Sequence, residues 1–192
     1  MNFILTLSIR VDLEDVITWS IRIDLEVGRP YNIQSIKIFF QKICNILDWT
    51  KGGQEYSSAE EALDLIWEGL KRYADENQDD IVSEEEWLKM WTDCVQDIQS
   101  GKQFPEWQQK FIDFMFKVND KSGDDEIDED EYTTVYTTLY GLKRDNCLTA
   151  FAKISGGKNI TRQEFEELWM EYFVSNDSSS KGNYLFGMKL VQ

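Results

Sequence analysis

Two twelve-residue segments, residues 75–86 and 120–131, place oxygen-bearing side chains at alternating positions. Seven acidic residues stand in the first segment and eight in the second, out of 36 in the whole chain. Like charges at that density repel one another, so a bound cation that neutralises them accounts for the pattern. A solvated acidic helix face would instead repeat its charges at the helical period. The spacing is typical of a chain that wraps around calcium.

Calcium takes about six to eight oxygen ligands, and a helix–loop–helix hand supplies them from loop positions one, three, five, seven, nine and twelve. In residues 75–86, called loop A, the predicted ligands are Asp75, Asn77, Asp79, the Ile81 carbonyl, Ser83 and Glu86. In residues 120–131, called loop B, they are Asp120, Ser122, Asp124, the Glu126 carbonyl, Asp128 and Glu131. Two Ca²⁺ sites are therefore predicted, with Mg²⁺ as a competitor. The position-twelve glutamate matters most, because both of its oxygens can reach the ion.

Both loops depart from the usual pattern at position six, where glycine eases a turn with positive φ. Asp80 and Asp125 stand there instead. Aspartate tolerates a left-handed backbone better than most residues, so a cost on the order of 1 kcal/mol and somewhat weaker binding are expected. Position eight carries Val82 and Ile127, which should form short strands that pair each loop with its neighbour. The alternative is that both segments are solvated, metal-free acidic loops between helices.

Two further loops are expected to stay empty. Residues 153–164, called loop C, put Lys153 at position one, where an ammonium group opposes a cation, and Ile160 at position eight. This loop should act as the structural partner of loop B. Residues 24–35 lack a carboxylate at position twelve, so no calcium is expected there either. The alternation of apolar and polar residues in the near-duplicated stretch 8–26 favours strand over helix.

Apolar residues at helical spacing surround these loops. A glutamate followed by apolar residues one, four and five positions later occurs at Glu86, Glu131 and Glu164, with a fainter copy at Ser35 that lacks the glutamate. Helices are also predicted over Ser58–Ala74, starting with a capping box from Ser58 to Glu61, and over Trp107–Val118, after Pro105. Their inward faces should carry Leu63, Ile66, Trp67 and Leu70 in the first helix, and Phe111, Met115 and Phe116 in the second.

Composition excludes several classes of function. A net charge of −16 disfavours nucleic acid and anionic membrane surfaces. No apolar run approaches the roughly 20 residues of a membrane span. Three widely spaced cysteines without zinc or disulfide spacing indicate reduced thiols and a cytoplasmic location. Histidine is absent and no nucleophile–base pair is visible, so an enzyme is not expected. We expect a monomer.

These residues are similar to a known family. From Lys42 to the carboxyl end the chain resembles calexcitin and the wider invertebrate sarcoplasmic calcium-binding proteins, in Leu65–Asn77, Glu85–Trp91, Glu171–Asp177 and Lys181–Gly187. The resemblance implies a compact, all-α protein with two pairs of EF-hands that acts as a cytosolic calcium buffer or signalling protein. In calexcitin the first three hands carry metal and the fourth is degenerate, which agrees with metal in loops A and B and none in loop C.

The resemblance also suggests how the chain divides. Residues 1–34 diverge and replace most of the first hand, residues 35–98 hold its remnant and the loop A hand, and residues 99–192 hold the last two hands and a tail.

The family has been discussed as binding guanine nucleotide and as a kinase target; no nucleotide motif is present, and Ser35 is only a nondescript phosphoacceptor. Five methionines and a tail, Tyr184–Phe186, that could fill a groove favour a buffer over a sensor, and a protein target stays open. The alternative function is a metal-independent adaptor that grips a partner helix.

Overall fold

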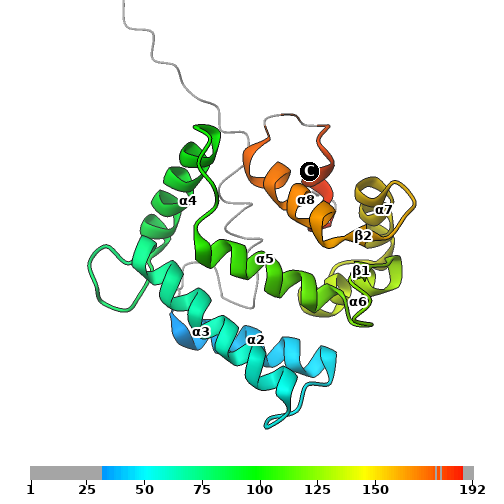
Figure 1. Cartoon of the computed structure of the whole chain (residues 1–192), viewed down its shortest axis with the longest axis horizontal. Coiled ribbons are helices and arrows are strands. Elements are labelled where there is room, and N and C mark those ends of the chain that lie inside the picture. The colour runs from blue at the N-terminus through cyan, green and yellow to red at the C-terminus, as the bar shows by residue number, and fades with distance from the viewer. Residues whose placement is uncertain (1–31, 176, 178, 188–192) are drawn as a thin grey trace, which may run out of the picture.

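Helices make up most of the chain in the computed structural model, which describes residues 32–175, 177 and 179–187 (Figure 1). The prediction of an all-α fold with loop–loop strand pairing is confirmed. In chain order the described elements are α2 (Ile33–Leu47), α3 (Gln54–Ala74), α4 (Glu84–Gln99), α5 (Glu106–Asn119), β1 (Glu126–Ile127), α6 (Glu129–Tyr140), α7 (Arg144–Ser155), β2 (Ile160–Thr161), α8 (Arg162–Val174) and the 3₁₀ turn η1 (Lys181–Tyr184).

The predicted apolar faces form the core. In α3 the expected stripe is buried, and the apolar residues that follow Glu86, Glu131 and Glu164 are at most 6% exposed. In α5, Met115 and Phe116 are buried, and Phe111 is half-buried against the same cluster. Helical spacing alone was enough to identify these faces, because residues three and four positions apart lie on one side of a helix.

The predicted start of α3 is wrong. The helix begins at Gln54, one turn before Ser58, and its N-cap is Gly53, which has no side-chain capping bond. Ser58 and Glu61 therefore lie inside the helix and form no capping box. The extra turn places the Tyr56 ring against Phe40 of α2, with ring centroids 4.8 Å apart. This tertiary contact favours the earlier start over the local cap.

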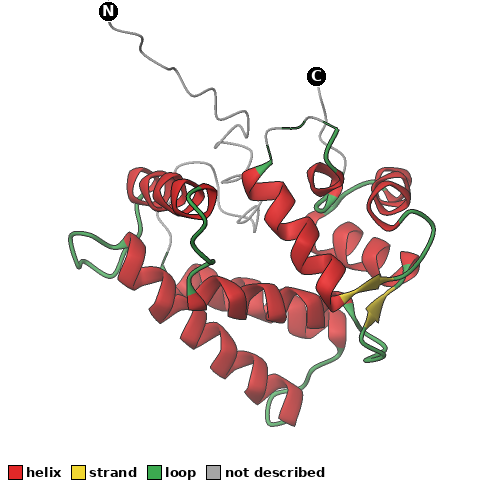
Figure 2. Ribbon diagram, turned by 45° about the horizontal axis from the view of Figure 1, so that its top comes forward, coloured by secondary structure: helices red, strands yellow, loops and turns green. Residues whose placement is uncertain are grey.

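One predicted strand pairing lies within the described residues. β1 and β2 run antiparallel, with Ile127 opposite Ile160, as the loop numbering predicted (Figure 2). Both isoleucines are buried. Val82 of loop A is also fully buried. Its expected partner loop, residues 24–35, and the expected strands in 8–26 lie almost wholly outside the described residues.

Aromatic rings join helices from the two halves of the chain. Trp91 of α4 stacks on Phe173 of α8, with centroids 4.4 Å apart and planes 3° from parallel. Trp107 of α5 lies edge-on to Trp91, and Trp169 of α8 lies edge-on to Phe111. Such ring pairs add about 0.5–1.5 kcal/mol each beyond the burial of their area. They fix where α4, α5 and α8 meet.

The carboxyl-terminal segment packs into the groove beside α6, α7 and α8. Leu185 is completely buried and Phe186 is 4% exposed. The Tyr132 hydroxyl lies 3.0 Å from the carbonyls of Tyr184 and Leu185 and accepts a hydrogen bond from the Gly187 amide at 3.1 Å. The tail is therefore anchored against these helices by buried apolar side chains and by hydrogen bonds.

Helices α3 and α5 touch most closely at Gly69. A Cβ atom placed on Gly69 would lie only 2.3 Å from the Cβ of Trp107, so no other side chain fits without a shift of the helices. Both Trp107 and its neighbour Ile66 are buried. Glycine is therefore required here for close approach, although its backbone is helical.

We expect Gly69→Val to lower the free energy of unfolding by about 2 kcal/mol, because overpacking a tight contact outweighs the gain in helix propensity. Urea unfolding in the presence of a calcium chelator measures this. The control is Arg72→Val, which puts the same side chain at an exposed position of α3. Equal losses in the two variants would contradict the close contact.

Candidate metal centre

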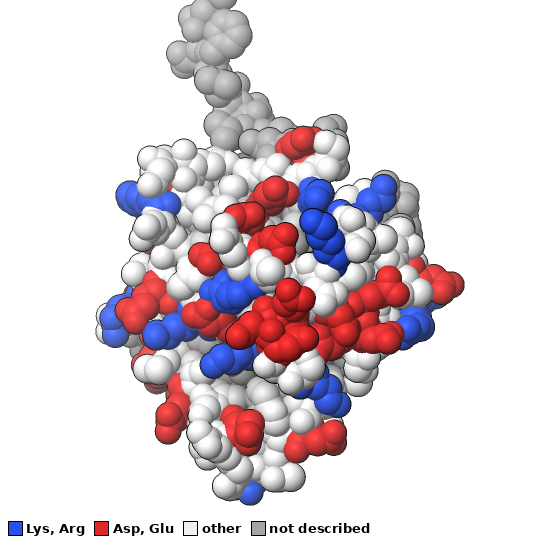
Figure 3. All heavy atoms as spheres, turned by 45° about the vertical axis from the view of Figure 1, so that its right-hand side comes forward, with Lys and Arg blue, Asp and Glu red and all other residues white. Residues whose placement is uncertain are grey.

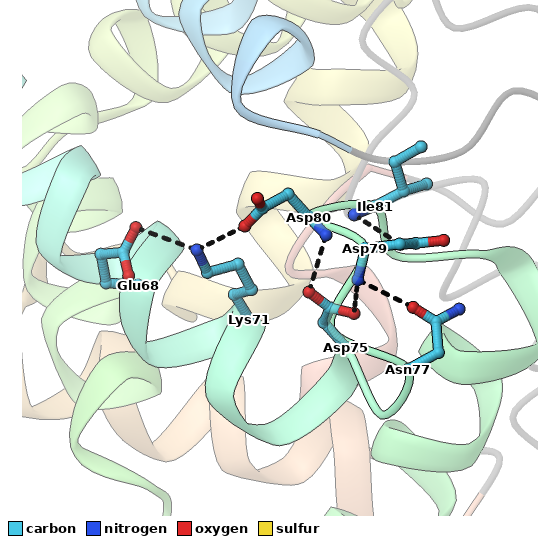
Figure 4. Close-up of polar contacts among 7 residues, drawn as sticks. All are labelled: Glu68, Lys71, Asp75, Asn77, Asp79, Asp80 and Ile81. Carbon is cyan, nitrogen blue, oxygen red and sulfur yellow. Dashed lines mark hydrogen bonds and ion pairs between the residues drawn. The ribbon is translucent and has the colours of Figure 1, made fainter.

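Loop A joins the end of α3 to the start of α4. Asp75 ends α3, and its own amide still donates to the carbonyl of Lys71 at 2.9 Å. Its carboxylate then accepts the amides of Asp79 and Asp80, each at 3.1 Å (Figure 4). The side chains of Asn77 and Asp79 each accept an amide two residues further on, at 2.9 Å. The loop is thus folded around the carboxylate of its first residue.

The other end of loop A is a capping box. Ser83 is the N-cap of α4: its hydroxyl accepts the Glu86 amide, and the Glu86 carboxylate accepts both the amide and the hydroxyl of Ser83, at 2.9 and 2.8 Å. These bonds lower the pKa of Glu86, the Ser83 amide contributing most, with smaller contributions from the amides of Asn77 and Glu76. The position-twelve carboxylate therefore faces the first turn of its own loop.

Loop B repeats this geometry between α5 and α6. The Asp120 carboxylate accepts the amides of Gly123, Asp124 and Asp125, at 2.8, 3.1 and 3.1 Å. At the far end, Asp128 caps α6 by accepting the Glu131 amide at 2.8 Å.

Glu131 spans loop B. One oxygen of its carboxylate accepts the Asp128 amide at 3.1 Å, and the other accepts the Ser122 amide at 2.7 Å. Position twelve is thus hydrogen-bonded to position three across the loop. Both Glu131 and Asp120 are half-buried, whereas Ser122 and Asp124 are exposed.

The backbone conformation expected at position six is confirmed. Asp80 and Asp125 have φ of 62° and 64°, in the left-handed region. Position four is left-handed as well, with φ of 61° at Gln78 and 75° at Gly123. The sequence reading missed position four, for which Gly123 was the available signal.

A lysine missed by the sequence reading pairs with loop A. The Lys71 ammonium lies 2.8 Å from the Asp80 carboxylate and 3.5 Å from Glu68 (Figure 4). The hydrogen bond to Asp80 is the main cause of the raised pKa of Lys71. Lys71 stands one turn before Asp75, so a basic residue at that spacing was the available signal. Asp80 therefore points away from the loop's predicted ligands and toward α3.

Loop C has a different backbone. Helix α7 continues through Ser155 to a left-handed Gly156, so Lys153, the nominal position one, lies within the helix. Thr161 caps α8 and holds the Glu164 carboxylate through its amide and hydroxyl, both at 2.9 Å. The pKa of Glu164 is lowered first by these Thr161 bonds and further by the charges of Lys158 and Lys181.

Loops B and C are also joined by side chains. The Asn159 side-chain amide donates to the Glu126 carboxylate at 2.9 Å, alongside the β1–β2 pairing. On the face drawn in Figure 3, acidic side chains gather into one broad patch with basic residues at its edges. Loops B and C are thus held together by both backbone and side-chain hydrogen bonds.

The backbone path and donor chemistry of loops A and B fit calcium. Each supplies hard oxygen donors on a loop already turned at its first residue. Across residues 32–187, omitting 176 and 178, no three acidic, cysteine or histidine side chains converge closely enough to hold an ion as they lie. The carboxylates instead accept amides and hydroxyls of their own loops. Coordination would therefore require rotation of these side chains away from their present partners.

Comparisons with known proteins agree with these loops. No protein-family model matches the chain. Sarcoplasmic calcium-binding proteins I, III and IV of Branchiostoma lanceolatum are 33% identical over 137 residues, covering 70% of this chain and 73% of the relative. The chain belongs to the sarcoplasmic calcium-binding protein and calexcitin family. The family members matched are calcium-binding proteins and not enzymes, as the sequence predicted.

Other matches support the same family and fold. Calexcitin-1 of Caenorhabditis elegans is 35% identical over 136 residues, covering 68% of this chain and 64% of the relative. The solved amphioxus sarcoplasmic calcium-binding protein superposes with a TM-score of 0.72 at 25% identity, covering 92% of this chain and 96% of that one. A Streptomyces coelicolor calcium-binding protein shares the fold alone, with a TM-score of 0.63 at 16% identity. Among the described residues, no helix is long and apolar enough to cross a membrane.

We expect Ser83→Ala to lower the free energy of unfolding by about 1 kcal/mol at neutral pH, because it removes the N-cap of α4. The pKa of Glu86 should rise toward its ordinary value. A carboxyl whose pKa is lowered on folding contributes stability above its unfolded pKa and loses it as the pH falls through its folded pKa, so the deficit should shrink toward acid pH. Urea unfolding with chelator at neutral and acid pH measures both effects.

The matched control is Ser58→Ala. Ser58 lies within α3 and caps nothing, so alanine there should be neutral or slightly stabilising. If both substitutions cost the same, the capping role of Ser83 is refuted.

Proposed function

We propose that this protein binds two calcium ions, one in loop A and one in loop B. The observation that carries the proposal is the turn at the start of the two loops, which loop C lacks. In loops A and B the first aspartate accepts the amides of positions five and six, and position six is left-handed. The capping box between positions nine and twelve occurs in all three loops and does not distinguish them. A pair of solvated loops would have no reason to share the same carboxylate-centred turn.

The predicted ligands take distinct roles in this proposal. Asp75 and Asp120 fold each loop and supply the first oxygen, while Glu86 and Glu131 supply the last two from the first turn of the exiting helix. The remaining donors are Asn77, Asp79, the Ile81 carbonyl and Ser83 in loop A, and Ser122, Asp124, the Glu126 carbonyl and Asp128 in loop B. A bound calcium ion would supply the positive charge that these anionic oxygens lack.

Loop C is proposed to remain free of metal and to support loop B. Its first ligand position is a lysine held in α7, and Glu164 is already engaged by Thr161 with two lysines nearby. Its contribution is mechanical: β2 pairs with β1, and Asn159 holds the Glu126 side chain. Both contacts orient the segment whose Glu126 carbonyl is the proposed position-seven ligand.

The proposed role is that of a cytoplasmic, monomeric calcium buffer or slow switch. A sensor would open an apolar groove for a target when calcium binds. Here the groove beside α6, α7 and α8 is occupied by Leu185 and Phe186. All three cysteines are free and buried, as expected in a reducing compartment.

Calorimetric titration of the chelator-treated protein should give two calcium sites, with Mg²⁺ competing. Glu131→Gln should reduce the number of strong sites to one, because it removes the negative charge of the position-twelve ligand and replaces one of its two coordinating oxygens with an NH₂ group. Glu164→Gln makes the same chemical change in loop C and should leave two sites. Absence of any calcium heat would favour the metal-independent adaptor, and a third site lost in Glu164→Gln would refute the assignment of loop C.

The double variant Leu185→Asp/Phe186→Asp should expose the carboxyl-terminal groove. We expect a several-fold rise in the fluorescence of a hydrophobic dye, because two buried apolar anchors become charged. Lys181→Ala, an exposed change in the same segment, is the control. In the unaltered protein, calcium should change dye fluorescence little; a large calcium-dependent rise would identify a sensor instead.

A further inference from the structure

A cavity of about 440 Å³ lies between the first half of α3, the face of α5 and the loop that follows α2. None of the proposed calcium ligands lines it. Its volume falls within the roughly 300–1,000 Å³ range of small-molecule sites. The proposed calcium function does not account for it.

The packing of two antiparallel helices creates this cavity. α3 and α5 are in closest contact at Gly69 and Trp107. Toward the beginning of α3, the wall consists of the small side chains of Ala59 and Ala62, which face Phe114 of α5. These small residues leave a space between the two helices. The helices cannot move together to close it, because they are already in tight contact at Gly69. The cavity is thus a fixed consequence of the fold.

Its walls are largely apolar and partly exposed to solvent. Phe114 is buried at the base, and Trp49, half-buried, closes one side. Leu65, at the rim, is 58% exposed, and it is one of the few large apolar side chains at the described surface with so much exposure. An apolar ligand would cover Leu65 and gain about 25 cal/mol for each Å² removed from water.

Two lysines of α5 give the cavity a positive side. Lys110 and Lys117 both line it, and they stand two turns apart, or roughly 10 Å along the helix. Lys110 has only a weak contact with Glu106, at 3.6 Å. Lys117 has no ion-pair partner among residues 32–175, 177 and 179–187. Two available ammonium groups at one cavity are unusual in a chain of net charge −16.

Two acidic residues, Glu55 and Asp113, also line the cavity. Asp113 lies between the two lysines on α5 but is ion-paired with Arg162 of α8. Glu55, in the first turn of α3, is the remaining carboxylate of the lining. With Asp113 held by Arg162 and Lys110 in contact with Glu106, Lys117 is the lysine of the lining that remains without an ion-pair partner among the described residues.

We propose that this cavity binds a single-chain amphiphile with an anionic head, of the fatty-acid class. The apolar tail lies along Ala59, Ala62 and Phe114, and the head pairs with Lys117. A carboxylate matches an ammonium group that has no other ion-pair partner, and a single alkyl chain matches a narrow apolar space between helices. A cationic amphiphile would meet the same walls with repulsion from the lysines.

Calorimetry with dodecanoate tests the proposal, in calcium-free buffer with a chelator because calcium soaps are insoluble. Dodecyltrimethylammonium, which has the same tail and the opposite charge, is the matched ligand, and both are used below their micelle concentrations. Dodecanoate should bind at about one equivalent and at least about tenfold more tightly than the cation. Acetate, the head without the tail, should give no heat.

Four variants, one of them a control, locate the site. Lys117→Glu should weaken dodecanoate binding by about tenfold or more, and Ala62→Trp should abolish it by filling the space. Lys102→Glu, the same charge change on an exposed lysine outside the cavity, should leave binding unchanged. Leu65→Asp provides a second blocking variant at an exposed position if Ala62→Trp does not fold.

The proposal is overturned if both dodecyl ligands bind equally, if the blocking variants bind like the unaltered protein, or if an acidic amphipathic peptide binds this surface while dodecanoate does not. The titration uses no calcium, so its outcome is independent of the two-site proposal for loops A and B.

Discussion

The carboxylate that ends each entering helix is the interaction on which both acidic loops depend. Asp75 and Asp120 are the C-cap residues of α3 and α5. The carboxylate of each accepts hydrogen bonds from two or three backbone amides of the following turn. These bonds turn the chain sharply enough that positions four and six become left-handed. The residues at these left-handed positions are Gln78 and Gly123 at position four and Asp80 and Asp125 at position six. Glycine and aspartate adopt a left-handed backbone more readily than most residues.

The helices that follow loops A and B, α4 and α6, fix the other end of each loop. Glu86 and Glu131 occupy the third position of α4 and α6, where an anion is favoured by the helix dipole and by the free amides of the first turn. The loop is therefore held between a helix end and a helix start, both of which are fixed by hydrogen bonds to carboxylates. The side chains proposed for coordination lie on this frame and accept hydrogen bonds from their own loops.

Differences between the loops follow from where positive charge stands. In loop A, Lys71 pairs with Asp80 and Lys89 pairs with Glu76, so acids outside the proposed ligand set are partly neutralised by the protein itself. In loop C, Lys158 and Lys181 act on Glu164, the one carboxylate that remains there. Positive charge in loop C is thus supplied by the chain's own lysines, and the strand of this loop pairs with that of loop B. The carboxyl-terminal segment is buried against the helices of the last two hands, which is the observation behind the proposed buffering role.

Much of this protein was determined by residues close together in the sequence. Loop turns, capping boxes and apolar helix faces all arise from contacts within about twelve residues. The apolar helix faces and the left-handed position six were predicted from spacing and residue type, whereas the capping boxes at Ser83, Asp128 and Thr161 were not predicted, and the one predicted at Ser58 was wrong. The start of α3 was not predicted correctly. The helix begins one turn earlier, and this turn packs the Tyr56 ring on Phe40, a contact between residues of two helices. The pairing of Asn159 with Glu126, the Asp113–Arg162 ion pair and the cavity beyond Gly69 join residues that are distant in the chain. Only helix packing brings such residues together, and no local pattern encodes the angle at which two helices cross.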